Sequence, residues 1–193
     1  MDMKLFNAQR KVEILKTYLK DGQSVLDFGC GDLFFAHQLH QTMHSLRITG
    51  VDVVDFGYRP KGILYKKYDG KTLPFKNASF DTVISYHVFH HTSAPFKLLS
   101  ECMRVAKKYV LFVEPVYRGF WDIPGMRVMD WIFNVWKDRS ISMPYAFASE
   151  KMWLREIKKL RYVSKERIDV ELLPKFLPTG RSLLFVCQKI HTS

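Results

Sequence analysis

Cysteine is scarce in this sequence, and long apolar runs are missing from it. Only three cysteines occur among the 193 residues, an odd number that is too small for a disulfide framework. No stretch approaches the roughly 20 uninterrupted apolar residues that a membrane-spanning helix needs, and the first residues form no apolar segment of the signal-peptide kind. We therefore expect a chain that stays in the reducing cytoplasm and does not cross a membrane.

Acidic residues are also in short supply. Asp and Glu number 19 against 30 Lys and Arg, so the net charge is +11 and the isoelectric point is near 9.6. A surface of this charge attracts nucleic acid, anionic lipid headgroups and phosphorylated substrates, although excess lysine also serves solubility alone. The length and the hydrophobic content of 47% suit one globular domain that spans residues 1–193.

Short apolar segments alternate with amphipathic ones along most of the chain. Five apolar segments have the length of buried strands, at residues 24–28, 46–55, 62–70, 79–88 and 107–115. Apolar residues at helical spacing occur at residues 7–22, 33–43 and 93–106. This order predicts a Rossmann-like α/β fold, in which helices cover both faces of a parallel sheet.

The last part of the chain predicts a different strand pairing. Residues 149–160 have helical spacing, with Ser149 as a candidate N-cap. Residues 165–174 and 181–190 are two strand-like segments with no helix between them, so they predict a hairpin. Together with the five earlier strands they predict a seven-stranded, mostly parallel sheet with a C-terminal antiparallel hairpin.

An acid and two glycines separate the first expected strand from the helix after it. Asp27 ends the strand in "DFGCG", and the turn then contains Gly29, Cys30 and Gly31. In an open α/β sheet, ligands bind beyond the carboxyl ends of the strands, and glycine lets the backbone approach them closely. A dinucleotide fingerprint from Gly29 would need a small residue at Phe34, so that interpretation fails. A carboxylate here instead suits S-adenosylmethionine, whose amino group and sulfonium are both cationic.

Two further acids follow expected strands. Asp52 ends the second strand next to Val53 and can accept hydrogen bonds from both hydroxyls of a ribose. Asp55 lies close by and is the rival acid. Asp69, which Gly70 follows, comes after the third strand and can accept from an adenine amine, although "DG" is also a common turn pair. These residues predict a nucleoside site along one edge of the sheet.

Four sequence blocks in this order resemble those of a known enzyme family. They are "VLDFGCGD", "ITGVDVVD", "YDGKTLPFKNASFDTVISYHVFHH" and "LLSECMRVAKKYVLFVEP", which extend from Val25 to Pro115. With them the chain resembles the class I S-adenosylmethionine-dependent methyltransferases of the UbiE-like, methyltransferase type 11 group. The resemblance implies an enzyme that uses S-adenosyl-L-methionine as its cofactor and methylates a small-molecule acceptor.

The resemblance also implies roles for individual positions. Those that correspond to the family's cofactor-binding residues are Asp27, Gly29, Cys30, Gly31, Asp52, Val53, Asp69, Gly70 and Tyr86. Tyr86 and His87 correspond to the positions nearest the methyl group. The chain departs from the family at Leu33, where a further glycine is usual. A leucine there would either narrow the cofactor pocket or pack against the sheet.

The segment "YHVFHH" and the end of the fifth expected strand hold the catalytic candidates, namely Tyr86, His87, His91 and Glu114. His90 and His91 are either structural histidines or groups that transfer a proton. Glu114 either positions a substrate or is one more acid at a strand end. The three histidines lack a standard zinc spacing and no cysteine pair accompanies them, so we expect no metal.

Residues 116–147 form an aromatic and basic insert after the fifth expected strand. Met129, Ile132, Phe133 and Trp136 fall on one helical stripe, and arginine and lysine are interleaved with the aromatic residues. The insert is either a lid that packs on the sheet or an apolar, basic-rimmed cover over a lipid-like or aromatic acceptor. The second interpretation includes peripheral contact with an anionic membrane surface.

The sequence therefore predicts methyl transfer to a small acceptor that is hydrophobic, lipid-like or anionic. Two alternatives belong to other classes. The charge and the interleaved aromatic residues also fit an RNA methyltransferase, but no RNA-binding module is appended. "SYHVFHH" also differs from the Asn/Asp-Pro-Pro-aromatic signature of enzymes that methylate nucleobase amines. Leu33 is the sequence support for the second alternative, a methyltransferase-like binding module without catalysis.

Overall fold

The computed structural model describes residues 3–134, 144–170 and 180–190. The chain divides into two compact units, the first with Met1–Ser85 and Glu101–Leu111, the second with Tyr86–Ser100 and Phe112–Ser193. The expectation of one domain over the whole chain stays a prediction. In the described part of the chain, no helix has the length and apolar character that crossing a bilayer requires.

The first unit is built on parallel strands. They are β1 (Ser24–Phe28), β2 (Arg47–Asp52), β3 (Ile63–Lys67) and β4 (Phe80–Tyr86), of which only Tyr86 belongs to the second unit. β1 lies between β2 and β4, and β3 pairs with the other side of β2. Because all these pairs are parallel, the carboxyl ends of the strands meet at one edge, and the predicted cofactor residues follow them there.

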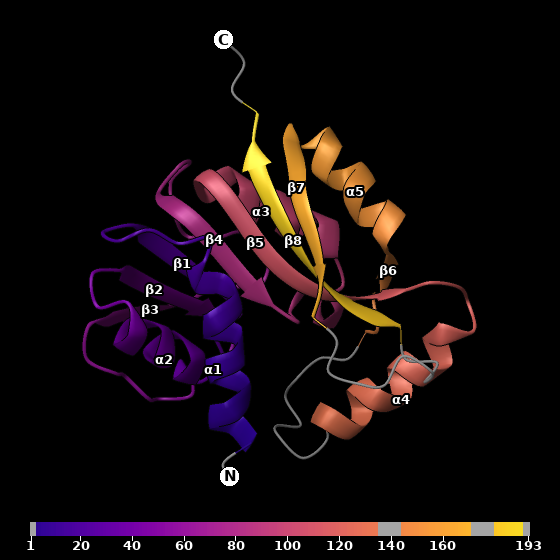
Figure 1. Ribbon diagram of the computed structural model, residues 1–193, viewed down its shortest axis with the longest axis horizontal. Coiled ribbons are helices and arrows are strands. Elements are labelled where there is room, and N and C mark those ends of the chain that lie inside the picture. Colours follow the sequence, from indigo (N-terminus) through magenta and orange to yellow (C-terminus); the bar gives the residue numbers. More distant parts are fainter. Residues whose placement is uncertain (1–2, 135–143, 171–179, 191–193) are drawn as a thin grey trace. The chain divides into compact units, whose positions relative to one another are not determined.

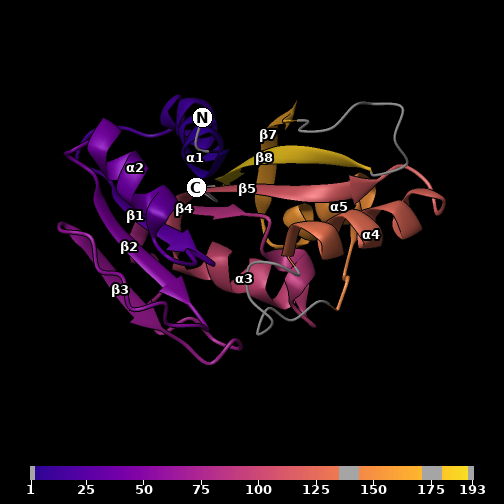
Figure 2. The same cartoon turned by 90° about the horizontal axis from the view of Figure 1, so that it is seen from below.

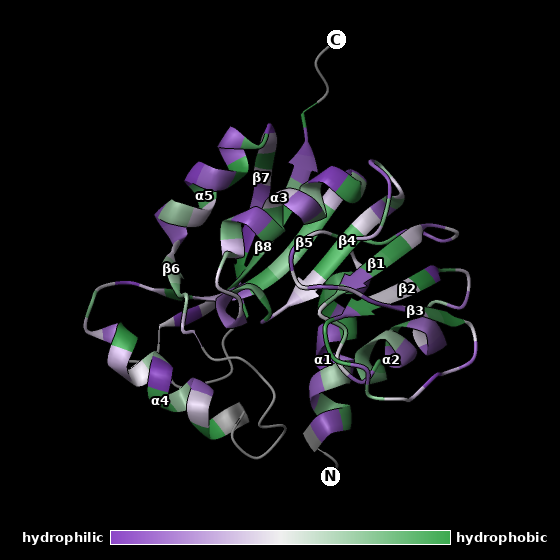
Figure 3. Cartoon of the chain, turned by 180° about the vertical axis from the view of Figure 1, so that it is seen from behind, coloured by the Kyte–Doolittle hydropathy of each residue, from purple (hydrophilic) through white to green (hydrophobic). Residues whose placement is uncertain are grey.

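The side chains explain why these strands form the core. Val25, Leu26 and Ile84 are at most 1% exposed, which is typical of parallel strands covered on both faces. Figure 3 shows the same pattern, with β1, β4 and β5 largely in hydrophobic colours. Asp81 helps to set the register of β1 and β4, since its Oδ2 accepts hydrogen bonds from the backbone N–H (2.8 Å) and Oγ (2.7 Å) of Ser24.

Two helices complete the N-terminal part of the first unit. α1 (Met3–Lys16) and α2 (Phe34–Thr42) pack against each other, and α2 also contacts β2 and β3 (Figure 1). α1 ends before Gly22, where the sequence predicted its end. The N–H of Tyr18 donates to the carbonyl of Leu15 at 3.0 Å, so the chain closes a tighter turn there and leaves the helix.

β5 (Ala106–Tyr117) belongs to both units, as does the preceding helix α3 (Pro95–Val105). In the second unit, β8 (Arg181–Lys189) lies beside β5, and β7 (Tyr162–Asp169) pairs with β8 in antiparallel orientation (Figure 2). The strand order is β3-β2-β1-β4-β5-β8-β7, with the short β6 (Ala148–Ser149) paired to β5. The prediction of a mostly parallel α/β sheet with a C-terminal antiparallel hairpin is thus confirmed, and β6 is an addition to it.

The remaining helices of the second unit are η1 (Phe89–His91), α4 (Asp122–Asn134) and α5 (Glu150–Lys159). Ser149 caps α5 as predicted, because its Oγ accepts the N–H of Met152 at 3.3 Å. Of the predicted aromatic stripe, Met129 and Ile132 lie on α4. Trp136 and the side chain of Phe133 lie outside the described residues.

β5 continues through Pro115, where the sequence predicted its end. Proline has no N–H to donate to a neighbouring strand. The pairing with β6 uses Val116 and Tyr117, opposite Ala148 and Ser149. No bond from Pro115 is needed in that register, so the strand extends to Tyr117.

Leu33, which replaces the family's usual glycine, packs against the sheet. It has a left-handed backbone (φ 62°) at the start of α2, and its side chain is 1% exposed. A Cβ atom added to Gly50 on β2 would lie only 2.3 Å from Leu33 Cδ2 and 2.8 Å from Cys30 Sγ. The leucine therefore occupies space that a side chain at position 50 would need, and this contact favours the second of the two interpretations of Leu33.

We expect Gly50→Ala to destabilise the fold by about 1–3 kcal/mol, because the added methyl overpacks the contact with Leu33. Urea unfolding measures the change. Gly119→Ala is the matched control, since an added Cβ at Gly119 meets no atom within 4 Å. Equal stability of the two variants would contradict the packing described for Leu33.

Candidate functional site

The glycine loop after β1 folds back onto the end of β2. Gly29 and Gly31 both have left-handed backbones, with φ of 73° and 53°. The N–H of Gly29 donates to the carbonyl of Val51 at 2.9 Å, and that of Cys30 to the same oxygen at 3.3 Å. Beside Gly31 the space is open, because an added Cβ would meet no heavy atom within 4 Å. This is the arrangement that lets a ligand approach the backbone closely.

Asp52 ties the end of β2 to this loop. Its Oδ2 accepts the N–H of Gly31 at 2.8 Å, and its Oδ1 accepts the N–H groups of Val53 at 2.7 Å and Val54 at 3.1 Å. The structure thus brings together three of the predicted cofactor residues. A carboxylate has about four lone-pair sites, so Asp52 keeps acceptor capacity for a ribose hydroxyl beside Gly31.

Asp27 is a buried carboxyl group on β1, only two residues before Gly29. It is 4% exposed, and among the described residues its Oδ2 has no hydrogen-bond partner. Burial raises the pKa of Asp27 to about 7; the positive charge of Lys11 opposes the rise, and the negative charge of Asp52 adds to it. Such a group is held in an unfavourable environment until a cation or another donor comes near it.

Cys30 and Asp55 do not add reactive groups to the loop. Burial, followed by the charges of Asp27 and Asp52, raises the pKa of the Cys30 thiol far above its usual range, so the thiol stays neutral. Asp55, the rival acid, pairs with Arg59 at 2.7 Å. Because Arg59 already neutralises Asp55, Asp52 is the better candidate for the ribose.

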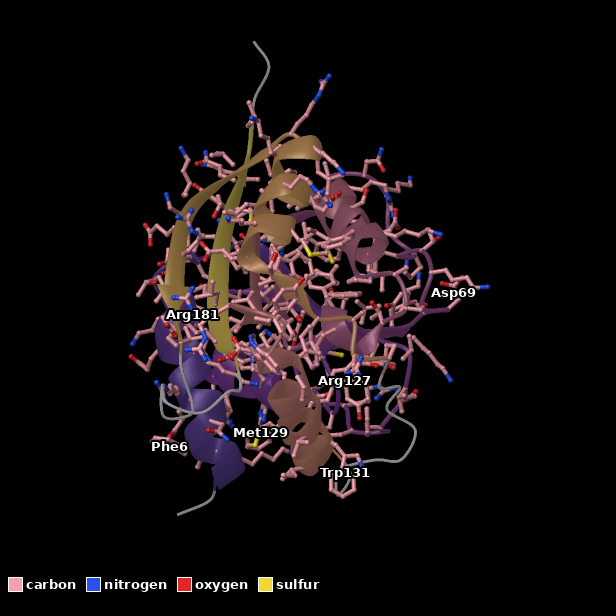
Figure 4. The ribbon with its side chains drawn as sticks, turned by 90° about the vertical axis from the view of Figure 1, so that its right-hand side faces the viewer. Phe6, Asp69, Arg127, Met129, Trp131 and Arg181 are labelled. Atoms are coloured by element: carbon pink, nitrogen blue, oxygen red, sulfur yellow. The ribbon has the colours of Figure 1, made fainter. Side chains whose placement is uncertain are left out.

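Asp69 and Gly70 differ in how well they fit their predicted role. Asp69 is exposed and points outward in Figure 4, and its Oδ1 accepts the N–H groups of Lys71 at 2.8 Å and Thr72 at 3.0 Å. That geometry is a turn, the alternative that the sequence left open. Gly70 lies next to Val53, since an added Cβ would be 3.4 Å from Val53 Cγ1. The adenine role of Asp69 stays a prediction.

In the second unit, Tyr86 and His87 begin the segment after β4. Their rings lie 4.8 Å apart between centroids. His87 has a left-handed backbone (φ 56°), and its N–H donates to the carbonyl of Val113 at 2.8 Å. A non-glycine residue in this conformation is uncommon and costs free energy, so the segment needs other bonds to hold it.

Glu114 supplies those bonds. It is fully buried, and its carboxylate accepts the N–H groups of Val88 at 2.7 Å, Phe89 at 2.8 Å and His90 at 3.3 Å. Its Oε2 also lies 2.7 Å from Nδ1 of His90. A carboxylate with this many partners and no exposed surface acts as a positioning residue for the turn. Substrate contact by Glu114 therefore has no support in this geometry.

Asp130 of α4 joins the same group, although no local motif in the sequence predicts it. Its Oδ1 lies 3.4 Å from Nε2 of His90 and 3.6 Å from Nε2 of His91. Burial lowers the pKa of His90, but the carboxylates of Glu114 and Asp130 outweigh it and raise the pKa to about 9. We call His90, His91, Glu114 and Asp130 the histidine–carboxylate cluster.

The cluster also bears on the expectation that the protein holds no metal. His90, His91 and Asp130 each offer one donor atom, and these atoms lie within 4.8 Å of one another. The carboxylates of Glu114 and Asp130 raise the pKa of His90, so a metal at this position would have to displace its proton. The absence of a metal stays a prediction.

The parallel sheet with a glycine loop after β1 and an acid after β2 defines the class I methyltransferase fold. Residues 26–113 match the sequence profile of a family described as "Methyltransferase domain", type 11. The resemblance drawn from the sequence is thereby confirmed for residues 26–113, the part of the chain that matches the type 11 methyltransferase model.

One group of relatives is similar in sequence, and several solved structures are similar in fold. The phthiotriol/phenolphthiotriol dimycocerosates methyltransferase of Mycobacterium tuberculosis is 30% identical over 93 residues, which are 45% of this chain and only 34% of that protein. An S-adenosylmethionine-dependent methyltransferase from Mesorhizobium loti has a similar fold, with a TM-score of 0.71, 14% identity and coverage of 93% and 98% of the two chains. The [4+2]-cyclase SpnF is similar as well, with a TM-score of 0.70, 14% identity and coverage of 93% and 80%.

Asp27→Asn should remove a pH dependence of stability. The native carboxyl keeps its proton up to about pH 7, whereas the ordinary pKa of an aspartate side chain is 3.8. The native state therefore binds more protons between these values, and Asp27 makes the wild type less stable as pH rises through the interval. The stability of Asp27→Asn relative to the wild type should rise from pH 4 to pH 7, by on the order of 4 kcal/mol. Urea unfolding across this range measures it, and a constant difference would rule out the raised pKa.

Glu114→Gln should cost about 3 kcal/mol, because it leaves His90 in a buried site with a weaker partner. Proton NMR of the histidine ring should show the pKa of His90 falling below its native value. Glu13→Gln is the matched control, since Glu13 forms an exposed ion pair with Lys16 and should change stability by less than about 0.5 kcal/mol. An unchanged His90 titration would contradict the role given to Glu114.

Proposed function

We propose that this protein transfers a methyl group from S-adenosyl-L-methionine to a small hydrophobic, lipid-like acceptor. The observation that carries the cofactor assignment is the buried carboxyl of Asp27, directly before a glycine loop that has open space beside Gly31. One oxygen of this carboxyl has no hydrogen-bond partner in the described part of the chain. A cationic ligand is the kind that such a group favours, because it stabilises the ionised form.

The residues of the first unit fit S-adenosylmethionine by their chemistry. Asp27 would offset the positive charge of the methionine part, and Gly29 and Gly31 would let the backbone approach it. Asp52 would accept the ribose hydroxyls, with Val53 and Gly70 against the adenine. When bound, the cofactor supplies a methyl group already activated on a cationic sulfur.

The remaining work of the chain is to hold an acceptor in line with that methyl group. Positioning of this kind accounts for several kcal/mol of a reaction barrier. Tyr86 is the first residue beyond Ser85, which pairs with Phe28 at the end of β1. The Tyr86 ring would stabilise the cationic sulfur of the cofactor by a cation–π contact. If the acceptor atom is a hydroxyl, His91 would accept the proton that it loses.

The acceptor class is argued from the relatives and from the surface. The mycobacterial relatives are named for lipid acceptors, and the described part of α4 exposes several apolar side chains. The basic net charge of +11 suits an acceptor with an anionic group. The three cysteines are buried and free of disulfides, which agrees with a reducing cytoplasmic setting.

Titration calorimetry tests the cofactor. The wild type should bind S-adenosylmethionine, and Asp52→Ala should bind it at least about tenfold more weakly, because hydrogen bonds to a charged group are lost. Asp55→Ala should leave the affinity unchanged. The wild-type affinity should rise with pH through about 7, where Asp27 ionises, and Asp27→Asn should bind weakly at every pH.

Transfer of a labelled methyl group tests the acceptor. Label in hydroxylated or phenolic lipids supports the proposal, and label in RNA from the same extract would replace it with the RNA methyltransferase. Absence of cofactor binding, or equal binding by Asp52→Ala, would favour a binding module without catalysis and overturn the proposal.

A further inference from the structure

Helix α4 turns both of its carboxylates inward. Asp122 is 6% exposed, and it accepts hydrogen bonds from the backbone N–H of Arg118 at 2.8 Å and from its guanidinium at 3.0 Å. Asp130 is bonded to His90 in the histidine–carboxylate cluster, and its side chain is 10% exposed. The two carboxylates are eight positions apart on the buried side of the helix, and the bond from Asp130 to His90 ties this side of α4 to η1 in the second unit.

The opposite side of α4 is apolar and open. Trp131 is 51% exposed on the helix, and Trp121, directly before the helix, is 76% exposed. Figure 4 shows Trp131 projecting away from α4. We call this surface the outer face of α4; its members are Phe120, Trp121, Arg127, Val128, Trp131 and Ile132, all of them exposed.

Like an ordinary surface helix, α4 buries an apolar residue, Met126, but its exposed side is also mainly apolar, where charged residues are usual. Apolar side chains that gather on one exposed face mark a site of interaction. Val128 and Ile132 are one helical turn apart, and Trp131 lies beside them, so the three make a continuous stripe. Exposure of this apolar stripe to water is unfavourable. We therefore expect a partner to cover it.

The chemistry of the stripe favours a lipid surface. Tryptophan and phenylalanine suit the boundary between headgroups and acyl chains, and amphipathic helices of this kind lie in the plane of the bilayer. α4 has 13 residues, which is roughly 20 Å of helix and far less than a bilayer core requires. Arg127 lies on the outer face while Asp122 and Asp130 face inward, so the exposed charge among the described residues of α4 is positive and complements anionic lipid headgroups.

We propose that the outer face of α4 docks on an anionic phospholipid bilayer, with Trp121 and Trp131 as the residues that enter the headgroup region. The proposal goes beyond methyl transfer, because it rests on α4 alone. A protein that is bound to a bilayer would encounter a lipid acceptor in the same bilayer. The docking proposal is tested by a binding measurement, so docking can fail while the methyltransferase assignment holds.

Vesicle flotation tests the docking. The full chain should bind phosphatidylcholine vesicles that contain phosphatidylserine, and it should bind pure phosphatidylcholine vesicles less well, with binding that weakens as salt is added. Trp121→Ser with Trp131→Ser should weaken binding about tenfold or more, because two large apolar side chains are lost. Leu64→Ser is the matched control, since Leu64 is an equally exposed apolar residue (70%) on β3 of the first unit and not part of the outer face of α4; it should bind like the wild type.

Tryptophan fluorescence provides the second readout. Lipids brominated on their acyl chains should quench the wild type, and Trp121→Phe with Trp131→Phe should still bind while losing most of the quenching. Binding by the serine variant equal to that of the wild type would overturn the proposal. A stable dimer that the serine variant abolishes would also overturn it, because the outer face would then be a self-association surface.

Discussion

A carboxyl group that is buried without a full set of partners is the constraint on which the cofactor site depends. Asp27 lies on a strand with apolar neighbours, and its pKa is raised to about 7 because water is excluded from it. Keeping such a group costs folding free energy. A cation that binds next to Asp27 would offset this cost, since the same burial strengthens the attraction between the carboxylate and the cation.

Glu114 shows the contrasting use of a buried acid. Its carboxylate accepts hydrogen bonds from three backbone N–H groups and faces the ring of His90. Groups of the protein itself therefore occupy its acceptor sites. Glu114 holds the strained turn at His87, whereas one oxygen of Asp27 has no partner among the described residues. Two buried acids on strands of the sheet thus differ in how fully the protein satisfies them, and only their partners distinguish them.

Much of the fold and part of the site could be predicted from the sequence, because the signals are local. The strands are short apolar runs, and Asp27, Gly29 and Gly31 are neighbours in the chain. Contacts between distant residues could not be predicted in this way. Asp130 contacts His90, which is 40 positions away in the sequence, and no local spacing predicts that pair.

The orientation of α4 shows the same limit. Helical spacing predicted a stripe through Met129 and Ile132, but the side that is buried depends on a residue distant in sequence, because Asp130 bonds to His90. Pro115 is a further case, since its effect on β5 depended on which residues β6 pairs with.

The fit between Leu33 and Gly50 couples two sites that the sequence keeps 17 positions apart. A leucine with a left-handed backbone is tolerated because β2 has no side chain at the point of contact. Each residue therefore sets which replacements the other can accept. In homologues with glycine at the first position, a small side chain at the second should be permitted, so evolution along this loop would proceed by paired, order-dependent steps.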